Sequence, residues 1–166
     1  MRLKVGDVFT IPIDENRLGL GQIINKPNKD SLIIVVYDFS FDKEIIPSLN
    51  GLEEYKILLL GQTLDAKLYH KHWIVIGNND KNITSIYLPY YKLGTPPKDI
   101  YIVNFKGETL RRATIHEFNT LNYQSIVAPV RYENALKAHF NLLNWDDIYD
   151  DLLYSYTLNS IKILNN

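Results

Sequence analysis

The first half of the chain alternates short apolar runs with polar turns, which is the pattern of consecutive β-strands. Along Val8–Ile13 the apolar side chains alternate onto one face, and Pro12 on the other face indicates an edge strand. The continuous β-branched run Leu32–Tyr37 is typical of a central strand with both faces covered. Three further strands are predicted over Leu18–Ile24, Tyr55–Leu60 and Trp73–Gly77.

The second half of the chain turns to helical spacing. Thr114 and Glu117 form a capping box, in which the hydroxyl and the carboxylate satisfy helix-end amides, so a short helix is expected after Thr114. Ser125–Val130 is predicted as a strand, because Pro129 would break a helix. A second helix is predicted from the apolar residues Tyr132, Leu136, Phe140 and Leu143.

A third helix is predicted from Asn144, a good N-cap residue. At about 100° per residue, one face of this helix is apolar and is expected to pack inward. That face contains Trp145, Ile148, Tyr149, Leu152, Leu153 and Tyr156. The opposite face contains Asp146, Asp147, Asp150 and Asp151, which are expected to point into solvent.

This order of elements predicts an α+β fold. Several short strands followed by helices favour a curled antiparallel sheet or partial barrel with an SH3-like start, and about three helices mainly in the C-terminal half. The 166 residues contain no repeat and no Pro/Gly/Ser-rich linker, so one domain over residues 1–166 is expected.

Composition narrows the class of protein. Hydrophobic residues make up 46% and charged residues 22%, as in globular proteins, and the absence of cysteine excludes disulfides, thiolate metal sites and cysteine nucleophiles. No apolar run approaches the ~20 residues of a membrane span, and the N-terminus lacks a secretory signal. A cytoplasmic protein without a membrane anchor is therefore expected. The net charge of −1 makes nucleic acid an unlikely partner.

The acidic face of the third helix has two interpretations. Asp146/Asp150 and Asp147/Asp151 are like-charged pairs at i,i+4, each unfavourable by roughly 0.2–0.5 kcal/mol. The face is either a solvated surface or a docking surface for a basic partner, since complementary charge raises association rate and specificity. Four carboxylates on one convex face do not converge on a metal ion.

Other patterns give weak signals for catalysis or cofactors. His70 and His72 would share a strand face, but a zinc site needs a third ligand, and His116 and His139 lie on separate predicted helices. Gly19-Leu20-Gly21 lacks the third glycine and the following helix of a dinucleotide fingerprint. These two glycines instead indicate sheet curvature or close backbone approach. No nucleophile–base–acid set stands out, so no enzyme activity and no cofactor are predicted.

Tyrosines gather in the middle of the chain. They surround the predicted exposed loop Lys92–Asp99, whose centre is Gly94-Thr95-Pro96-Pro97. Tyrosine is enriched at interfaces but also packs well in strands, and both interpretations stay open. The tyrosines are Tyr87, Tyr90, Tyr91 and Tyr101.

Three segments resemble the immunity protein 26 family of bacterial polymorphic toxin systems. The opening Gly6–Pro12 and Leu18–Ile23 resembles the start of that family, and His72–Asn78 is similar to its Trp–Ile–Gly element. Ser125–Arg131, which leads into a helix, is also similar in kind. The residues Tyr69–His72 depart from the family pattern, where a glycine and an arginine are expected. The resemblance spans roughly residues 4–150 and implies a cytoplasmic antidote that binds and silences a cognate toxin without any catalytic residue.

The leading hypothesis is therefore an immunity protein that occludes a protein toxin, such as a nuclease domain with a basic cleft. The predicted contact residues are Asp146, Asp147, Asp150, Asp151, Tyr90 and Tyr91. The alternatives are an SH3-like regulatory module that binds nucleic acid or a transcription component, which would be retained on heparin, and an enzyme with an unrecognised site.

Overall fold

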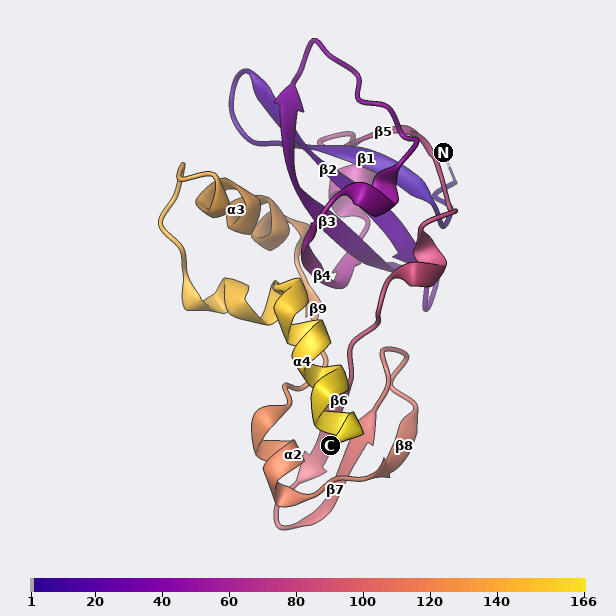
Figure 1. The fold of residues 1–166 in the computed structure, drawn as a ribbon, viewed down its shortest axis with the longest axis vertical. Coiled ribbons are helices and arrows are strands. Elements are labelled where there is room, and N and C mark those ends of the chain that lie inside the picture. Colours follow the sequence, from indigo (N-terminus) through magenta and orange to yellow (C-terminus); the bar gives the residue numbers. More distant parts are fainter. Residues whose placement is uncertain (1) are drawn as a thin grey trace. The chain divides into compact units, whose positions relative to one another are not determined.

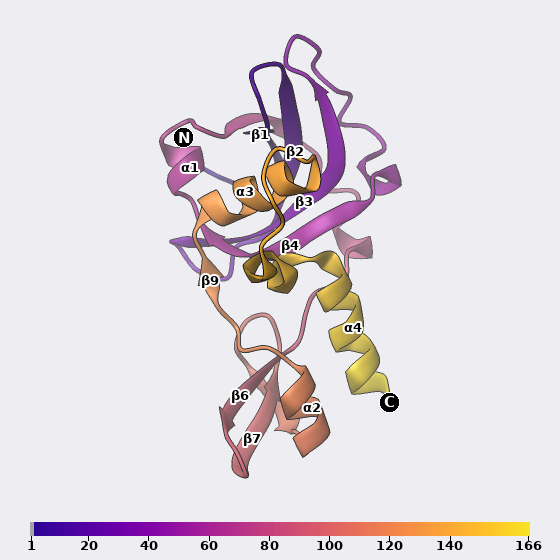
Figure 2. The same cartoon turned by 90° about the vertical axis from the view of Figure 1, so that its left-hand side faces the viewer.

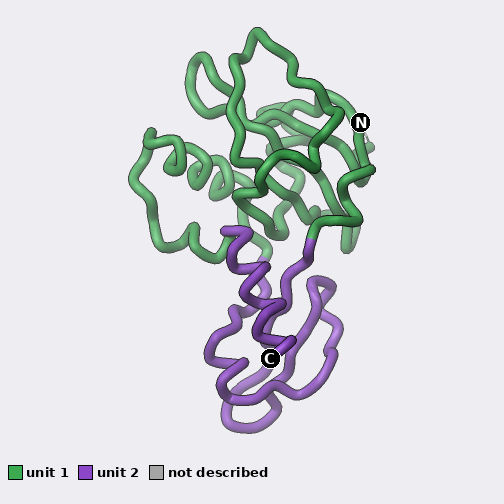
Figure 3. Tube along the Cα trace, in the orientation of Figure 1, with its two compact units in different colours: residues 1–86, 126–152 green, residues 87–125, 153–166 purple. Residues whose placement is uncertain are grey.

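The computed structural model describes residues 2–166, which divide into two compact units. The first unit contains residues 1–86 and 126–152, and the second contains residues 87–125 and 153–166 (Figure 3). Each unit therefore combines segments that are far apart in the sequence. The expectation of one domain over residues 1–166 stays a prediction.

The first unit is built on a six-stranded sheet with the order β5-β1-β2-β3-β4-β9 (Figure 1). All neighbouring strands are antiparallel except β4 and β9, which are parallel. Because β5 and β9 are its two ends, the sheet is open and is not a closed barrel. The strands are β1 (Asp7–Pro12), β2 (Arg17–Asn25), β3 (Ser31–Asp42), β4 (Ile57–Leu64), β5 (Ile74–Asn78) and β9 (Ile126–Val127). Short helices accompany them: η1 (Leu52–Glu54), α1 (Ala66–Tyr69) and η2 (Ile83–Ser85).

Strand β3 is the central strand that its β-branched run predicts. Its residues from Ser31 to Tyr37 are all buried, and it pairs with β2 on one side and β4 on the other. The edge assignment of the first strand is wrong, because β1 pairs with both β2 and β5. The β5 pairing ends at Thr10, however, so Pro12 has a neighbour only in β2. Proline is tolerated there because the missing N–H faces no strand.

Helix α3 (Pro129–His139) covers one face of this sheet (Figures 1 and 2). Tyr132 and Leu136 are fully buried, and the Tyr132 hydroxyl donates a hydrogen bond to the Gln62 carbonyl at 3.1 Å. Gly19 lies directly against the Leu136 side chain, so a Cβ at this position would clash with it. Gly19 therefore leaves room for a side chain of α3, whereas the sequence predicted sheet curvature or close approach of the backbone.

The second unit is a three-stranded antiparallel sheet in the order β6-β7-β8 with two helices. Its elements are β6 (Tyr91–Thr95), β7 (Lys98–Val103), β8 (Thr109–Arg112), α2 (Ile115–Thr120) and α4 (Tyr154–Asn165). The predicted loop Lys92–Asp99 is shorter than expected, because its first residues belong to β6 and its last two to β7. The mixed α+β class, with the longer helices in the C-terminal half, is confirmed.

The capping box of α2 is confirmed and is extended by an arginine. The Thr114 hydroxyl accepts from the Glu117 N–H, and the Glu117 carboxylate accepts from the Thr114 N–H at 2.8 Å. Arg111 donates to both Glu117 oxygens at 3.0 and 2.8 Å. These donors, the Arg111 guanidinium first, lower the pKa of Glu117 to about 2. The bidentate pair therefore connects β8 to the start of α2.

Acid is expected to remove the stabilisation that Glu117 provides. Its folded pKa lies below the ordinary value of 4.5, so the stabilisation is fully present above pH 4.5 and is lost as the pH falls towards 2. Thermal unfolding of the wild type and of Glu117→Gln should therefore differ by about 1–3 kcal/mol above pH 4.5, with the difference shrinking below it. A difference that does not change with pH would contradict this prediction.

Candidate functional site

The four predicted contact aspartates lie in one exposed segment of the first unit, residues 141–152. This segment contains four aspartates and no lysine or arginine, and all four carboxylates are exposed to solvent. Asp146 accepts a hydrogen bond from the Ile148 N–H at 3.0 Å, and Asp150 accepts one from the Trp145 indole at 2.8 Å. Neither donor carries a charge. Within residues 2–166, no lysine or arginine forms an ion pair with Asp146, Asp147 or Asp150.

The prediction of one continuous α-helix from Asn144 through Tyr156 is wrong. Residues Asp147–Leu152 form a short 3₁₀ helix, η3, and α4 begins separately at Tyr154 after an extended Leu153. Tyr149 and Leu152 are buried and stand three residues apart, which is the repeat of a 3₁₀ turn. The low helix propensity of aspartate and the two like-charged i,i+4 pairs also disfavour an α-helix here.

This change of form alters which side chains face solvent. Trp145 and Ile148 were expected on the buried face, but 39% of Trp145 and 48% of Ile148 is exposed. The sequence pattern missed them because it assumed one continuous α-helix through Tyr156. The segment thus presents apolar and acidic side chains together.

Tyr90 and Tyr91 lie in the second unit and are half-buried; Tyr91 is the first residue of β6, and Tyr90 directly precedes it. The Tyr90 N–H donates to the Ser160 hydroxyl at 3.1 Å, and its carbonyl accepts from the Tyr156 hydroxyl at 2.8 Å. The Tyr91 ring stacks on the Tyr156 ring with centroids 5.9 Å apart. Both tyrosines therefore help to hold α4 within this unit. The aspartates and the tyrosines belong to different units and are described separately.

The histidines do not form a metal site in the part of the chain that the structure describes. His70 follows helix α1 and His72 lies in the next turn, with ring centroids 6.4 Å apart. His139 is within 2.7 Å of Asp38. No group of three or more histidine or carboxylate side chains among residues 2–166 is arranged to hold a metal ion.

A buried carboxylate that the sequence did not single out, Glu133, belongs to α3. Glu133 accepts a hydrogen bond from the Trp73 indole at 3.0 Å and lies 3.2 Å from Lys67 and 3.1 Å from Lys137. Burial alone would raise the pKa of Glu133, but these three donors outweigh it, and its pKa is lowered. The carboxylate stays charged and connects α1, α3 and the residue before β5. This is a structural role, since the carboxylate connects three segments of the chain through these contacts.

A second buried polar cluster lies on the other side of the sheet. The Tyr37 hydroxyl donates to Gln22 Oε1 at 2.6 Å, and Asn82 Nδ2 donates to both of these oxygens, at 2.9 and 3.0 Å. Burial raises the pKa of Tyr37 to about 12, so its hydroxyl keeps its proton at neutral pH. A fixed, protonated phenol bonded to two amides positions η2 against the sheet and offers no reactive base.

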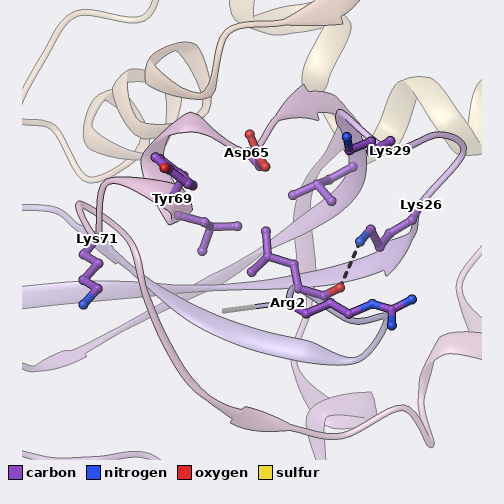
Figure 4. Close-up of a pocket in the computed structure, with 9 residues that line it drawn as sticks. Arg2, Lys26, Lys29, Asp65, Tyr69 and Lys71 are labelled. Carbon is purple, nitrogen blue, oxygen red and sulfur yellow. Dashed lines mark hydrogen bonds between the residues drawn. The ribbon is translucent and has the colours of Figure 1, made fainter.

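A cavity of about 390 Å³ lies between the N-terminal segment, the β2–β3 turn and α1 (Figure 4). Its lining includes four cations and one carboxylate: Arg2, Lys26, Lys29, Lys71 and Asp65. Lys26 already donates to the Leu3 carbonyl at 2.9 Å, and Lys71 points away from the other cations. The cations do not converge on one point. These four cations are spread from residue 2 to residue 71, so no local sequence motif predicts that they line one cavity.

Comparison with known proteins adds one match. A family model described as immunity protein 26 matches residues 4–99, which is more than half of the chain. No curated protein and no solved structure matches. None of the helices in residues 2–166 combines the length and the apolar character needed to cross a bilayer.

Proposed function

Since the chain belongs to the immunity protein 26 family, we propose that it binds a cognate bacterial toxin and neutralises it by occluding the toxin's functional surface. The family match is the observation that carries this proposal. It supports an immunity function, whereas toxin occlusion is the specific form of that function that we infer. Binding alone suffices for such a role, so no catalytic residue is assigned.

The proposed contact residues lie on two surfaces. The carboxylates of the 141–152 segment are exposed and have a local excess of negative charge, which favours a basic partner. Tyr90 and Tyr91 are half-buried and offer a smaller contact surface on the second unit. A nuclease toxin would fit the first surface, because a cleft that binds phosphates is basic. We place this action in the cytoplasm, where a cysteine-free chain is suited to reducing conditions.

Neutralising the charge of the 141–152 segment is expected to weaken toxin protection. The change is D146N/D147N/D150N/D151N, in which each amide oxygen can still accept the hydrogen bonds of the carboxylate. The expected result is at least a 10-fold slower association with a toxin domain taken from a neighbouring gene, because electrostatic steering is removed. Association is measured by surface plasmon resonance, and protection by growth of cells that co-express the two proteins.

The matched control changes the same number of charges elsewhere on the first unit. The variant E15Q/D30N/E44Q/E54Q removes four exposed carboxylates and should keep association within about 2-fold of the wild type. Equal slowing in both variants would show that only net charge matters and would remove the assignment of the 141–152 segment. If the wild type neither binds nor protects, the proposed function itself is wrong.

A further inference from the structure

The 141–152 segment displays large apolar side chains as well as carboxylates. A folded surface commonly exposes single hydrophobic residues, but several within one short segment indicate an interaction site. The exposed fractions are 43% for Leu142, 45% for Leu143, 39% for Trp145 and 48% for Ile148. These side chains occur within the same segment as the four aspartates.

Trp145 is held in place before any partner arrives. Its indole N–H donates to Asp150 Oδ1 at 2.8 Å, and its ring meets the Tyr149 ring edge to face, with centroids 5.3 Å apart and an interplanar angle of 79°. Tyr149 is itself buried, and Leu152 packs near Gly61 of β4, so η3 is anchored in the first unit. A side chain that is already ordered loses little conformational entropy when it binds.

This arrangement has the features of a binding hot spot. Tryptophan is among the residues most enriched at hot spots, where an apolar side chain fills a pocket and is surrounded by residues that exclude water. Here the indole is exposed enough to enter a pocket, and its polar N–H is already satisfied by Asp150. It can therefore be desolvated without leaving an unpaired donor.

The charge of the segment determines the chemistry of its partner. A nucleic acid or the anionic surface of a membrane would be repelled by a segment that has four exposed aspartates and no lysine or arginine. A second copy of the chain, docked through the same surface, would bring two sets of carboxylates together. A protein with an apolar pocket bordered by lysine and arginine side chains complements both features of the segment.

We propose that Trp145 is the central anchor of the toxin interface, and that the toxin presents an apolar pocket with a basic rim to receive it. This inference rests on the proposed function and deepens it by naming the anchor and the chemistry of the partner. The four aspartates raise the association rate through electrostatic attraction. Burial of the indole in the pocket accounts for most of the slow dissociation of the complex. Ile148 adds apolar contact beside it.

The test measures binding of a toxin domain taken from a neighbouring gene to the wild type and to Trp145→Ala. The variant is expected to raise Kd at least about 30-fold, mainly through faster dissociation. The control is Tyr69→Ala, which truncates an aromatic side chain that is 75% exposed on α1 of the same unit, and should stay within about 2-fold of the wild type. If Trp145→Ala also stays within 3-fold of the wild type, the anchor assignment is wrong while the proposed function stands. If the wild type does not bind, the proposed function fails.

A fluorescence measurement covers the case in which Trp145→Ala does not fold. The chain has two tryptophans, and the other, Trp73, is 1% exposed, so acrylamide quenching reports mainly on Trp145. Adding the toxin domain should lower the quenching constant of the wild type several-fold, and Trp145→Phe should lose this response. Unchanged quenching in a complex that forms would overturn the inference.

Discussion

Replacing Trp73 by alanine is expected to lower the free energy of unfolding by about 4 kcal/mol. Trp73 is 1% exposed, and its ring stacks on Phe9 of β1 with centroids 5.2 Å apart and planes 8° from parallel. The substitution creates a large cavity in the core of the first unit. It also removes the indole donor of Glu133, which leaves a buried carboxylate with one partner fewer.

Two milder variants separate the packing from the polar contact. Trp73→Phe keeps an aromatic ring near Phe9 but removes the N–H, whereas Glu133→Gln keeps an acceptor for the indole and removes the charge that pairs with Lys67 and Lys137. Each is expected to cost about 1–3 kcal/mol. Their double variant should cost less than the sum of the two, because both changes weaken the same network.

Urea unfolding monitored by far-UV circular dichroism measures these differences without relying on tryptophan fluorescence. A loss below 1 kcal/mol for Trp73→Ala would contradict the packing described here. If the losses in free energy of unfolding of Trp73→Phe and Glu133→Gln simply add in the double variant, the indole and the carboxylate act independently.

The strands of the first unit were predictable because their hydrophobic pattern is local. The run Leu32–Tyr37 has apolar side chains on both faces, and its short length and β-branched residues favour a strand covered on both faces over a buried helix. The capping box at Thr114 was predictable for the same reason, since its donors and acceptors lie within four residues. The pairing of β4 with β9 was not, because the two strands are separated by more than sixty residues in the sequence.

The third helix shows where helical periodicity misleads. Tyr149 and Leu152 are compatible with either an α-helix or a 3₁₀ turn, and the aspartates around them disfavour the α-helix by only a small free energy. Packing decides, because Leu152 lies near Gly61 and both side chains must be buried together. As a consequence, Trp145, which was predicted on the buried face, is partly exposed and available to a partner.

Glu133 was missed because its partners come from distant parts of the chain. Lys67 belongs to α1 and Trp73 precedes β5, and only the tertiary fold brings them to α3. Lys137 alone, at i,i+4 from Glu133, was visible as a helix pair, but such pairs are common on exposed helix faces. Burial is what distinguishes this site, and burial is a property of the fold.

The segments that resemble the immunity family contribute several residues to the core of the first unit. Gly19 lies against Leu136, and Trp73 stacks on Phe9, so these residues of the motifs have a packing role. The 141–152 segment lies beyond residues 4–99, the range that matches the family. A shared scaffold with a separate recognition segment would allow related chains to bind different toxins.

Gly21→Val is expected to lower the free energy of unfolding by about 3 kcal/mol through overpacking. An ideal Cβ on Gly21 would lie 2.5 Å from both Cε2 and Cζ of Phe9, well inside van der Waals contact. Phe9 is fully buried and held by the stacked Trp73 ring, so it cannot move aside without disturbing the core. Urea unfolding of the variant measures the loss.

The Phe9→Leu substitution provides the internal control for this prediction, because it removes the ring atoms that meet the new side chain. Phe9→Leu alone should cost about 1–2 kcal/mol through lost packing. In the double variant the two costs should not add, since the smaller leucine makes room for the valine, and a coupling energy of about 1 kcal/mol or more is expected. Simple additivity would mean that Gly21 is required for a reason other than its contact with Phe9.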